Sequence, residues 1–151
     1  MQHFDHNYID HVMTRLARID AQAPALWGRM DRAAMVRHLA DLVRYSMGQG
    51  APMPDKSTWA TRHILAPLLM HGIVRIPKNI QASEPPKFEL DEILEPNPDK
   101  YLLRMMQEYL DAVQADEITP HVHPAFGNVG IDGWSKLHVA HFDHHLRQFG
   151  V

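Results

Sequence analysis

The sequence contains no cysteine. This absence excludes disulfide bonds, thiolate metal ligands and cysteine nucleophiles. Long apolar runs are also missing, since the longest, ILAPLLM at residues 64–70, is far too short to span a bilayer. The N-terminal residues lack the basic start and apolar centre of a signal peptide. We therefore expect a cytoplasmic protein that makes no contact with a membrane.

An excess of basic residues is absent as well. Lys and Arg number 15 against 18 Asp and Glu, which gives a formal net charge of −3. The chain therefore has no general positive field for binding nucleic acid or anionic lipid. No phosphate-binding loop or nucleophile motif narrows the choice of substrate, so we expect only that the partner is a small molecule.

What the sequence does have is a globular composition with many histidines. Its 151 residues, 45% apolar and 22% charged, fit a single domain over residues 1–151 with a substantial core. The 12 histidines do not form a consecutive tract. Their number favours a metal-binding or acid–base role, but their positions matter more than their number.

Apolar residues recur at helical spacing in five stretches, and no stretch alternates like a β-strand. The predicted helices cover residues 4–22, Asp31 to Gly48, residues 57–72, residues 97–114 and Asp132 to Gly150. Pro67 would kink or divide the third of them. Residues 73–96 are rich in proline, which is typical of an irregular crossover. The sequence therefore predicts an all-α fold, an antiparallel four-helix bundle with a long crossover and the third stretch as a helical insertion.

The last predicted helix carries two histidines on its apolar face. At about 100° per residue, His141 and His145 point the same way as Trp134 and Leu137, whereas His144 lies on the flank. Residues four apart have Cβ atoms about 5–6 Å from each other, so two imidazoles can converge on one metal ion. The alternative is that both are hydrogen-bonded core residues, because this spacing also arises by chance in a histidine-rich chain.

The second predicted helix offers a third ligand. His38 shares its face with Met35, Leu42 and Tyr45, so it is expected to be buried. Alone it would be interpreted as a structural histidine, but with an inward pair on another helix it completes a three-histidine set. Three neutral imidazoles leave a coordination position open for water or substrate. Asp41, one turn further on, could orient an imidazole or be solvated.

Two further histidines are candidates for acid–base catalysis, because histidine titrates near physiological pH. His123 precedes Pro124 on the loop that leads into the last helix. It could be a fourth ligand, a proton-transfer group or a residue that stabilises the turn. His138 lies beside the inward pair, where it could donate a hydrogen bond, contact a substrate or pack in the core.

The segments MVRHLADL at residues 35–42 and HFDHHLRQ at residues 141–148 resemble the DinB/YfiT-like superfamily of metal-binding four-helix bundles. That superfamily has a histidine in its second helix and an H-x-x-x-H-x-x-Q pattern in its last. More narrowly, the longer segments around them resemble an uncharacterised subfamily of unknown function. The resemblance covers most of the chain and is vague over residues 50–96.

This resemblance implies a divalent metal ion, often nickel or zinc, bound by His38, His141 and His145. Some relatives are transferases or isomerases that use low-molecular-weight thiols, and bundles of this kind often form homodimers. One departure is that Leu146 and Arg147 stand where the superfamily often has Arg-Gly. Details of cofactor-side packing are therefore not carried over.

Three functional hypotheses follow from these observations. The leading one is a metal-dependent enzyme of the transferase or hydrolase type with a three-histidine site. The second is a non-catalytic bundle protein that binds a metal or a small ligand. The third is a bundle whose histidines are structural, in which case chelators would leave its stability unchanged.

Overall fold

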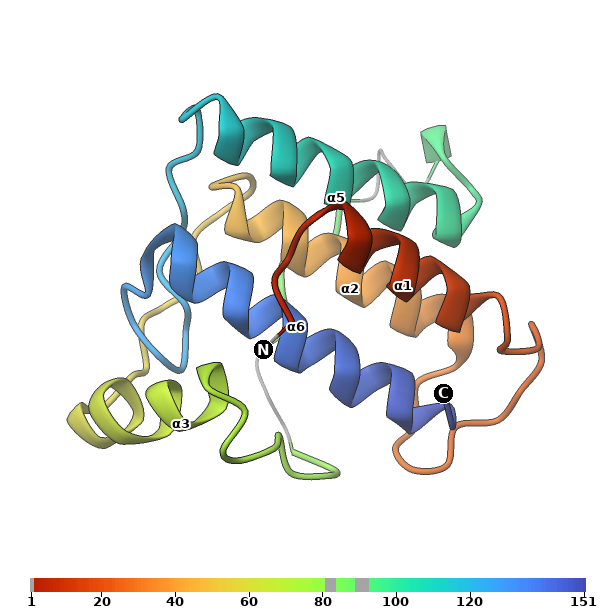
Figure 1. Cartoon of the computed structure of the whole chain (residues 1–151), viewed down its shortest axis with the longest axis horizontal. Helices are drawn as coiled ribbons and strands as arrows, with labels where there is room; N and C mark the ends of the chain where they lie inside the picture. Colours follow the sequence, from red (N-terminus) through yellow and green to blue (C-terminus); the bar gives the residue numbers. More distant parts are fainter. Residues whose placement is uncertain (1, 81–83, 89–92) are drawn as a thin grey trace.

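The computed structural model describes residues 2–80, 84–88 and 93–151 of the chain, and over these residues it is helical without β-strands. The longer helices lie side by side in Figure 1, with a short helical segment against the start of the last one. The helices are α1 (His6–Leu16), α2 (Arg32–Ser46), η1 (Thr61–Leu65), α3 (Ala66–Met70), α5 (Pro98–Gln114) and α6 (Gly130–Gln148). None of the described helices is both long and apolar enough to cross a membrane.

Two helices start where their capping residues predict. Asp31 accepts a hydrogen bond from the backbone N–H of Ala34 at 2.8 Å, which satisfies one of the free donors at the start of α2. Asn97 does the same for two N–H groups at the start of α5, where Pro98 occupies the first turn. The predicted starts of these helices are confirmed.

α1 is shorter than residues 4–22, the range predicted from its apolar spacing. The helix ends at Leu16, and the chain continues as turns in which Ile19 donates a hydrogen bond to the Leu16 carbonyl. Phe4 and Ile19 are nevertheless buried, at 8% and 6% exposure. The spacing therefore predicted correctly which residues face the core, but the turns that carry the two outer residues are not helical.

The third predicted stretch is divided just before Pro67, as the sequence suggests. η1 is a π-helix, in which the N–H of Ala66 bonds to the carbonyl of Thr61, and α3 follows directly. Proline has no N–H, and its ring clashes with the carbonyl one turn earlier in a regular α-helix. The π-helix is rare and occurs mostly as a single wide turn within an α-helix, as it does here next to Pro67.

The buried core is formed jointly by α1, α2, α5 and α6. α2 packs on α5 and on α6, and α1 also contacts both of these helices. A bidentate ion pair between Arg32 and Asp99, at 2.8 and 2.9 Å, ties the start of α2 to the start of α5. The largest core side chains include Leu16, Met35, Leu39, Leu102, Met106, Tyr109, Phe142 and Leu146. This packing sets α2 and α6 side by side, which is what positions the site.

Candidate metal centre

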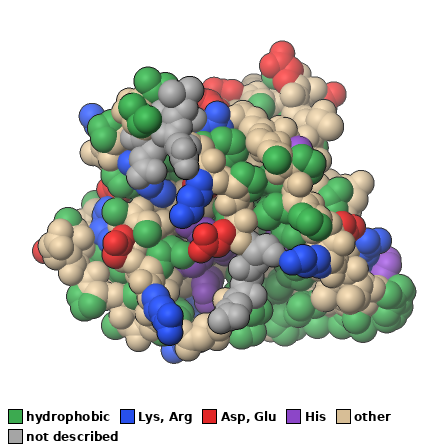
Figure 2. Space-filling model, turned by 180° about the vertical axis from the view of Figure 1, so that it is seen from behind, with side chains coloured by type: hydrophobic (Ala, Val, Ile, Leu, Met, Phe, Trp, Pro, Cys, Tyr) green, Lys and Arg blue, Asp and Glu red, His purple; other side chains and the backbone are tan. Residues whose placement is uncertain are grey.

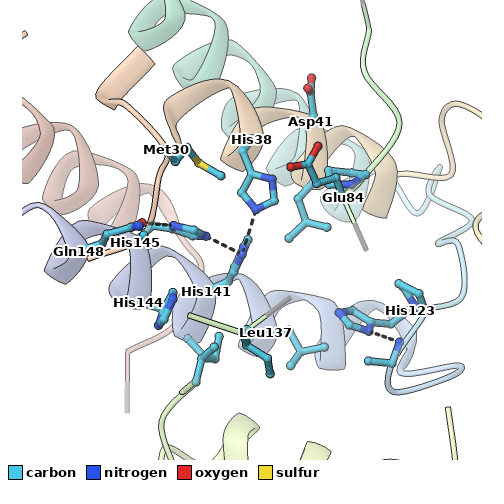
Figure 3. Close-up of a pocket in the computed structure, with 18 of the residues that line it drawn as sticks. Met30, His38, Asp41, Glu84, His123, Leu137, His141, His144, His145 and Gln148 are labelled. Atoms are coloured by element: carbon cyan, nitrogen blue, oxygen red, sulfur yellow. Dashed lines mark hydrogen bonds between the residues drawn. The ribbon is translucent and has the colours of Figure 1, made fainter. Parts of the chain in front are cut away.

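His38, His141 and His145 meet between α2 and α6, as the sequence predicts. His141 Nε2 lies 3.3 Å from His38 Nε2 and 3.0 Å from His145 Nε2. The three ligand atoms all lie within 4.8 Å of one another, so the set could hold a metal ion. Figure 3 shows the ring of His38 pointing from α2 toward the two rings on α6.

Gln148 fixes the tautomer of His145. The Nε2 of Gln148 donates to the backbone carbonyl of Trp27 at 2.7 Å, which sets the orientation of the amide. Its Oε1 then faces His145 Nδ1 at 2.8 Å and can only accept, so Nδ1 carries the proton. His145 Nε2 is left with a lone pair directed at the other two histidines. A hydrogen-bonded outer nitrogen is the usual arrangement for a metal-binding histidine.

Hydrogen bonds between the three rings cannot satisfy all three Nε2 atoms at once. His145 Nε2 presents a lone pair, and His141 Nε2 carries at most one proton. His141 Nε2 can therefore form a full hydrogen bond with only one of its two neighbours. In the other contact, two lone pairs or two N–H groups face each other. A cation between the three nitrogens uses all three lone pairs at once.

The spacing and the electrostatics of the cluster both fit a metal ion. With Zn–N bonds of about 2.0–2.1 Å, neighbouring nitrogens of a tetrahedral site lie about 3.3–3.4 Å apart. The distances from His141 Nε2 to the other two nitrogens, 3.3 and 3.0 Å, are close to this value. Burial lowers the pKa of His38, lowers that of His145 to about 4, and with the two neighbouring rings holds the pKa of His141 well below its usual range. All three rings are therefore neutral at pH 7, which is the form that binds metal.

A cavity of about 1580 Å³ opens over the cluster, between α2, α6, the η1–α3 segment and parts of residues 74–80 and 84–88. In Figure 2 histidine side chains are visible in a hollow, with acidic and basic side chains around them. Apolar residues such as Leu42, Leu69 and Leu137 form much of the wall. The three-histidine set thus faces a space that a small molecule could enter.

His123 lies in the same cavity but away from the cluster, near the start of α6 in Figure 3. Its Nδ1 accepts a hydrogen bond from the N–H of Ala125 at 3.1 Å, within a turn closed by Gly127. The ring stacks on Phe126, and burial lowers its pKa to about 4. The group of ligand atoms within reach of one ion, among the residues that the structure describes, does not include His123.

His138 does not line the cavity and lies in the core. The hydroxyl of Ser46 donates to the Val43 carbonyl at 2.7 Å, so His138 Nε2 is the donor in its 2.8 Å contact with Ser46. Aromatic rings surround the imidazole, with Trp134 stacked at 5.5 Å between ring centroids. Its Nδ1 is buried and has no hydrogen-bond partner in the described part of the chain. Packing, one of the three roles considered for His138, is what this position fits.

The structure places two neighbouring residues differently from the simplest sequence interpretation. His144, predicted on the flank of α6, is only 7% exposed, and its ring meets that of Trp27 at 6.0 Å. Asp41 accepts a hydrogen bond from the Tyr101 hydroxyl at 3.1 Å, and Figure 3 shows its carboxylate pointing away from the histidines. Neither residue belongs to the group of possible ligands.

The role of Gln148 was not predicted, although the residue ends the H-x-x-x-H-x-x-Q pattern of the last helix. The signal was its i, i+3 spacing from His145, which brings the two side chains together on a helix. No sequence signal indicated that the Trp27 carbonyl would orient Gln148, because this carbonyl comes from a loop. Gly28, beside it, has a φ of +79°, and a Cβ there would lie 2.6 Å from Gln148 Nε2.

Fold and site together define an all-helical protein with three histidines that could hold a metal ion. Residues 1–150 match the family described as "Protein of unknown function (DUF1569)", and the chain belongs to that family. No curated protein and no solved structure matches the chain.

Proposed function

We propose that this protein is a DinB-like antiparallel four-helix bundle that binds one divalent metal ion through His38, His141 and His145. The observation that carries the proposal is the convergence of three Nε2 atoms for which protons alone give no complete hydrogen bonding. The resemblance in both histidine segments supports the bundle class. It also favours nickel or zinc, although imidazole suits several metals.

We further propose a metal-dependent enzyme of the transferase or hydrolase type, with a small molecule as substrate and a thiol as its possible co-substrate. A divalent ion held by three imidazoles supplies Lewis acidity and lowers the pKa of a water or thiol bound to it. The described residues offer three protein ligands and a cavity beside them, which favours an open position. A non-catalytic binding protein would be favoured by a fourth protein ligand.

Proton transfer is assigned to His123 rather than His138 in this proposal. His123 lines the cavity, and its low pKa keeps the ring neutral at pH 7. With Nδ1 accepting from Ala125, the neutral ring carries its proton on Nε2 and can act as a hydrogen-bond donor. His138 is enclosed by core side chains, so its part is to hold α6 in place.

The first test is metal content. Tag-free protein, loaded with zinc or nickel and desalted, should carry about one ion per chain by elemental mass spectrometry, and His141→Ala should carry almost none. The central position of His141, in contact with both other nitrogens, is the reason to remove it. His63→Ala, which removes an exposed histidine on η1, is the matched control and should keep the ion.

Two outcomes would overturn the proposal. One is wild-type protein that takes up neither zinc nor nickel. The other is unchanged metal content in His141→Ala when circular dichroism shows that the variant is folded.

A further inference from the structure

The two outer ligands of the proposed site differ in what holds their second nitrogen. His145 Nδ1 donates to Gln148, which fixes both its proton and its orientation. His38 directs Nε2 at His141, so Nδ1 lies on the other side of its ring. Within the described part of the chain, no hydrogen bond is made by this Nδ1. A metal-binding histidine in this situation normally donates to a carboxylate, a carbonyl or water.

A carboxylate lies close to that ring. Glu84 lines the same cavity, and Figure 3 shows its carboxylate beside His38, on the side away from His141. The charge of Glu84 raises the pKa of His38, against the larger lowering caused by burial. The carboxylate of Asp41, which Figure 3 also labels near this ring, points away from the histidines and accepts from the Tyr101 hydroxyl. Glu84 is therefore the better placed acceptor for His38.

Glu84 is held there by the residues that follow it. Pro85 is buried, and the ring of Phe88 lies under the guanidinium of Arg44 on α2, with Cζ 4.1 Å from the ring centroid. Gly50 leaves room for this ring, since a Cβ at that position would meet Phe88 atoms at 3.0 and 3.1 Å. Residues 84–88 are thus anchored against the C-terminal part of α2, the helix that carries His38.

We propose that Glu84 is a positioning residue of the metal centre: when the metal ion is bound, its carboxylate accepts the Nδ1–H of His38 and thereby directs the Nε2 lone pair at the metal. The inference rests on the proposed metal binding, which it deepens. Glu84 is not among the residues whose atoms could reach the ion together with the three histidines, so it acts through His38. It also makes residues 84–88 a functional part of the site.

The test is the zinc affinity of Glu84 variants, measured by competition with a chromophoric chelator. Loss of an outer partner of a metal ligand typically costs about 10–100-fold in affinity, and we expect Glu84→Gln to bind zinc that much more weakly. Glu84→Asp, which keeps the charge on a shorter side chain, should lie between this variant and the wild type. Glu117→Gln removes the same charge from an exposed position after α5 and is the matched control.

A second measurement separates positioning from a general charge effect. In zinc-loaded protein labelled with ¹⁵N-histidine, the Nδ1–H proton of His38 should resonate at low field, as expected for a donor to a carboxylate. Glu84→Gln should move this signal upfield, and Glu117→Gln should leave it in place. The affinity loss in Glu84→Gln should also persist at 0.5 M NaCl, where long-range charge effects are largely screened.

The inference and the function it rests on fail in different ways. If the wild type binds zinc and Glu84→Gln binds it with unchanged affinity, the role of Glu84 is overturned and the metal site stands. If the loss disappears at high salt, or the His38 signal does not move, the positioning role is likewise overturned. If the wild type binds no metal at all, the proposed function itself is overturned.

Discussion

At the scale of single residues, the chemistry of the site depends on the contact between Gln148 and His145. Its amide is oriented by the Trp27 carbonyl and in turn holds the proton of His145 on Nδ1. The 2.6 Å approach that a Cβ at Gly28 would make to this amide shows how tightly the loop fits. A loop before α2 thereby helps to select the tautomer of a residue at the end of α6.

Replacing Gln148 should weaken metal binding without removing a ligand. In Gln148→Leu the tautomer and orientation of His145 are no longer fixed, and we expect zinc affinity to fall about 10–100-fold. Chelator competition measures this loss directly. Gln107→Leu, on the exposed side of α5, is the control for the change from amide to apolar side chain. Equal zinc affinities in the two variants would contradict this role.

The site was predictable where helix geometry decides it. The spacing of His141 and His145 and the apolar face around His38 were sufficient to predict the cluster. The burial of His144 was not predicted, because a helical projection says which residues share a face but not which loop covers that face. Trp27, from the segment between α1 and α2, packs on His144 and buries it. Irregular segments carry no periodicity from which this contact could be derived.

At the scale of elements, local chemistry explains which helix boundaries were predictable. α2 and α5 start next to side chains that accept from the first free N–H groups, and these starts were predicted correctly. α6 starts at Gly130, two residues before the predicted Asp132, with no side-chain cap from Val129. Where the N-cap residue itself has no capping side chain, the sequence gives only an approximate position.

The cap of α5 should contribute measurably to stability. Asn97 Oδ1 accepts from the N–H groups of Asp99 and Lys100, at 3.0 and 3.2 Å. Asn97→Ala leaves these donors to water and should lower the free energy of unfolding by about 1 kcal/mol. The measurement is the urea midpoint with an unchanged slope. Asn97→Asp keeps an acceptor and should stay close to the wild type, so equal losses in both variants would count against capping.

At the scale of the whole molecule, buried neutral histidines link stability to pH. Burial lowers the pKa of His138 to about 3, whereas a histidine in the unfolded chain has a pKa of about 6.5. Its hydrogen bond to Ser46 already uses Nε2–H, and among the residues that the structure describes the buried Nδ1 has no acceptor for a second proton. Between these two pKa values the unfolded chain binds a proton that the folded protein does not.

Stability should therefore fall as the pH is lowered from about 6.5 toward 3, and be unaffected by this group above that window. The slope from one such histidine approaches about 1.4 kcal/mol per pH unit. Urea unfolding at pH 7 and pH 5, in the presence of EDTA, measures the difference. His138→Gln can still donate to Ser46 but does not titrate, so its stability should change less between the two pH values. The same change in both proteins would exclude His138 as a source.

The distance along the chain between His38 and His141 has a consequence for a protein that lacks cysteine. The two residues are 103 positions apart, so an ion bound to both would close most of the chain into one loop. A disulfide closing a loop of about 100 residues is worth about 4.7 kcal/mol in the chain-entropy treatment. A bound ion would act as a comparable cross-link, one that chelation opens and that no reductant can break.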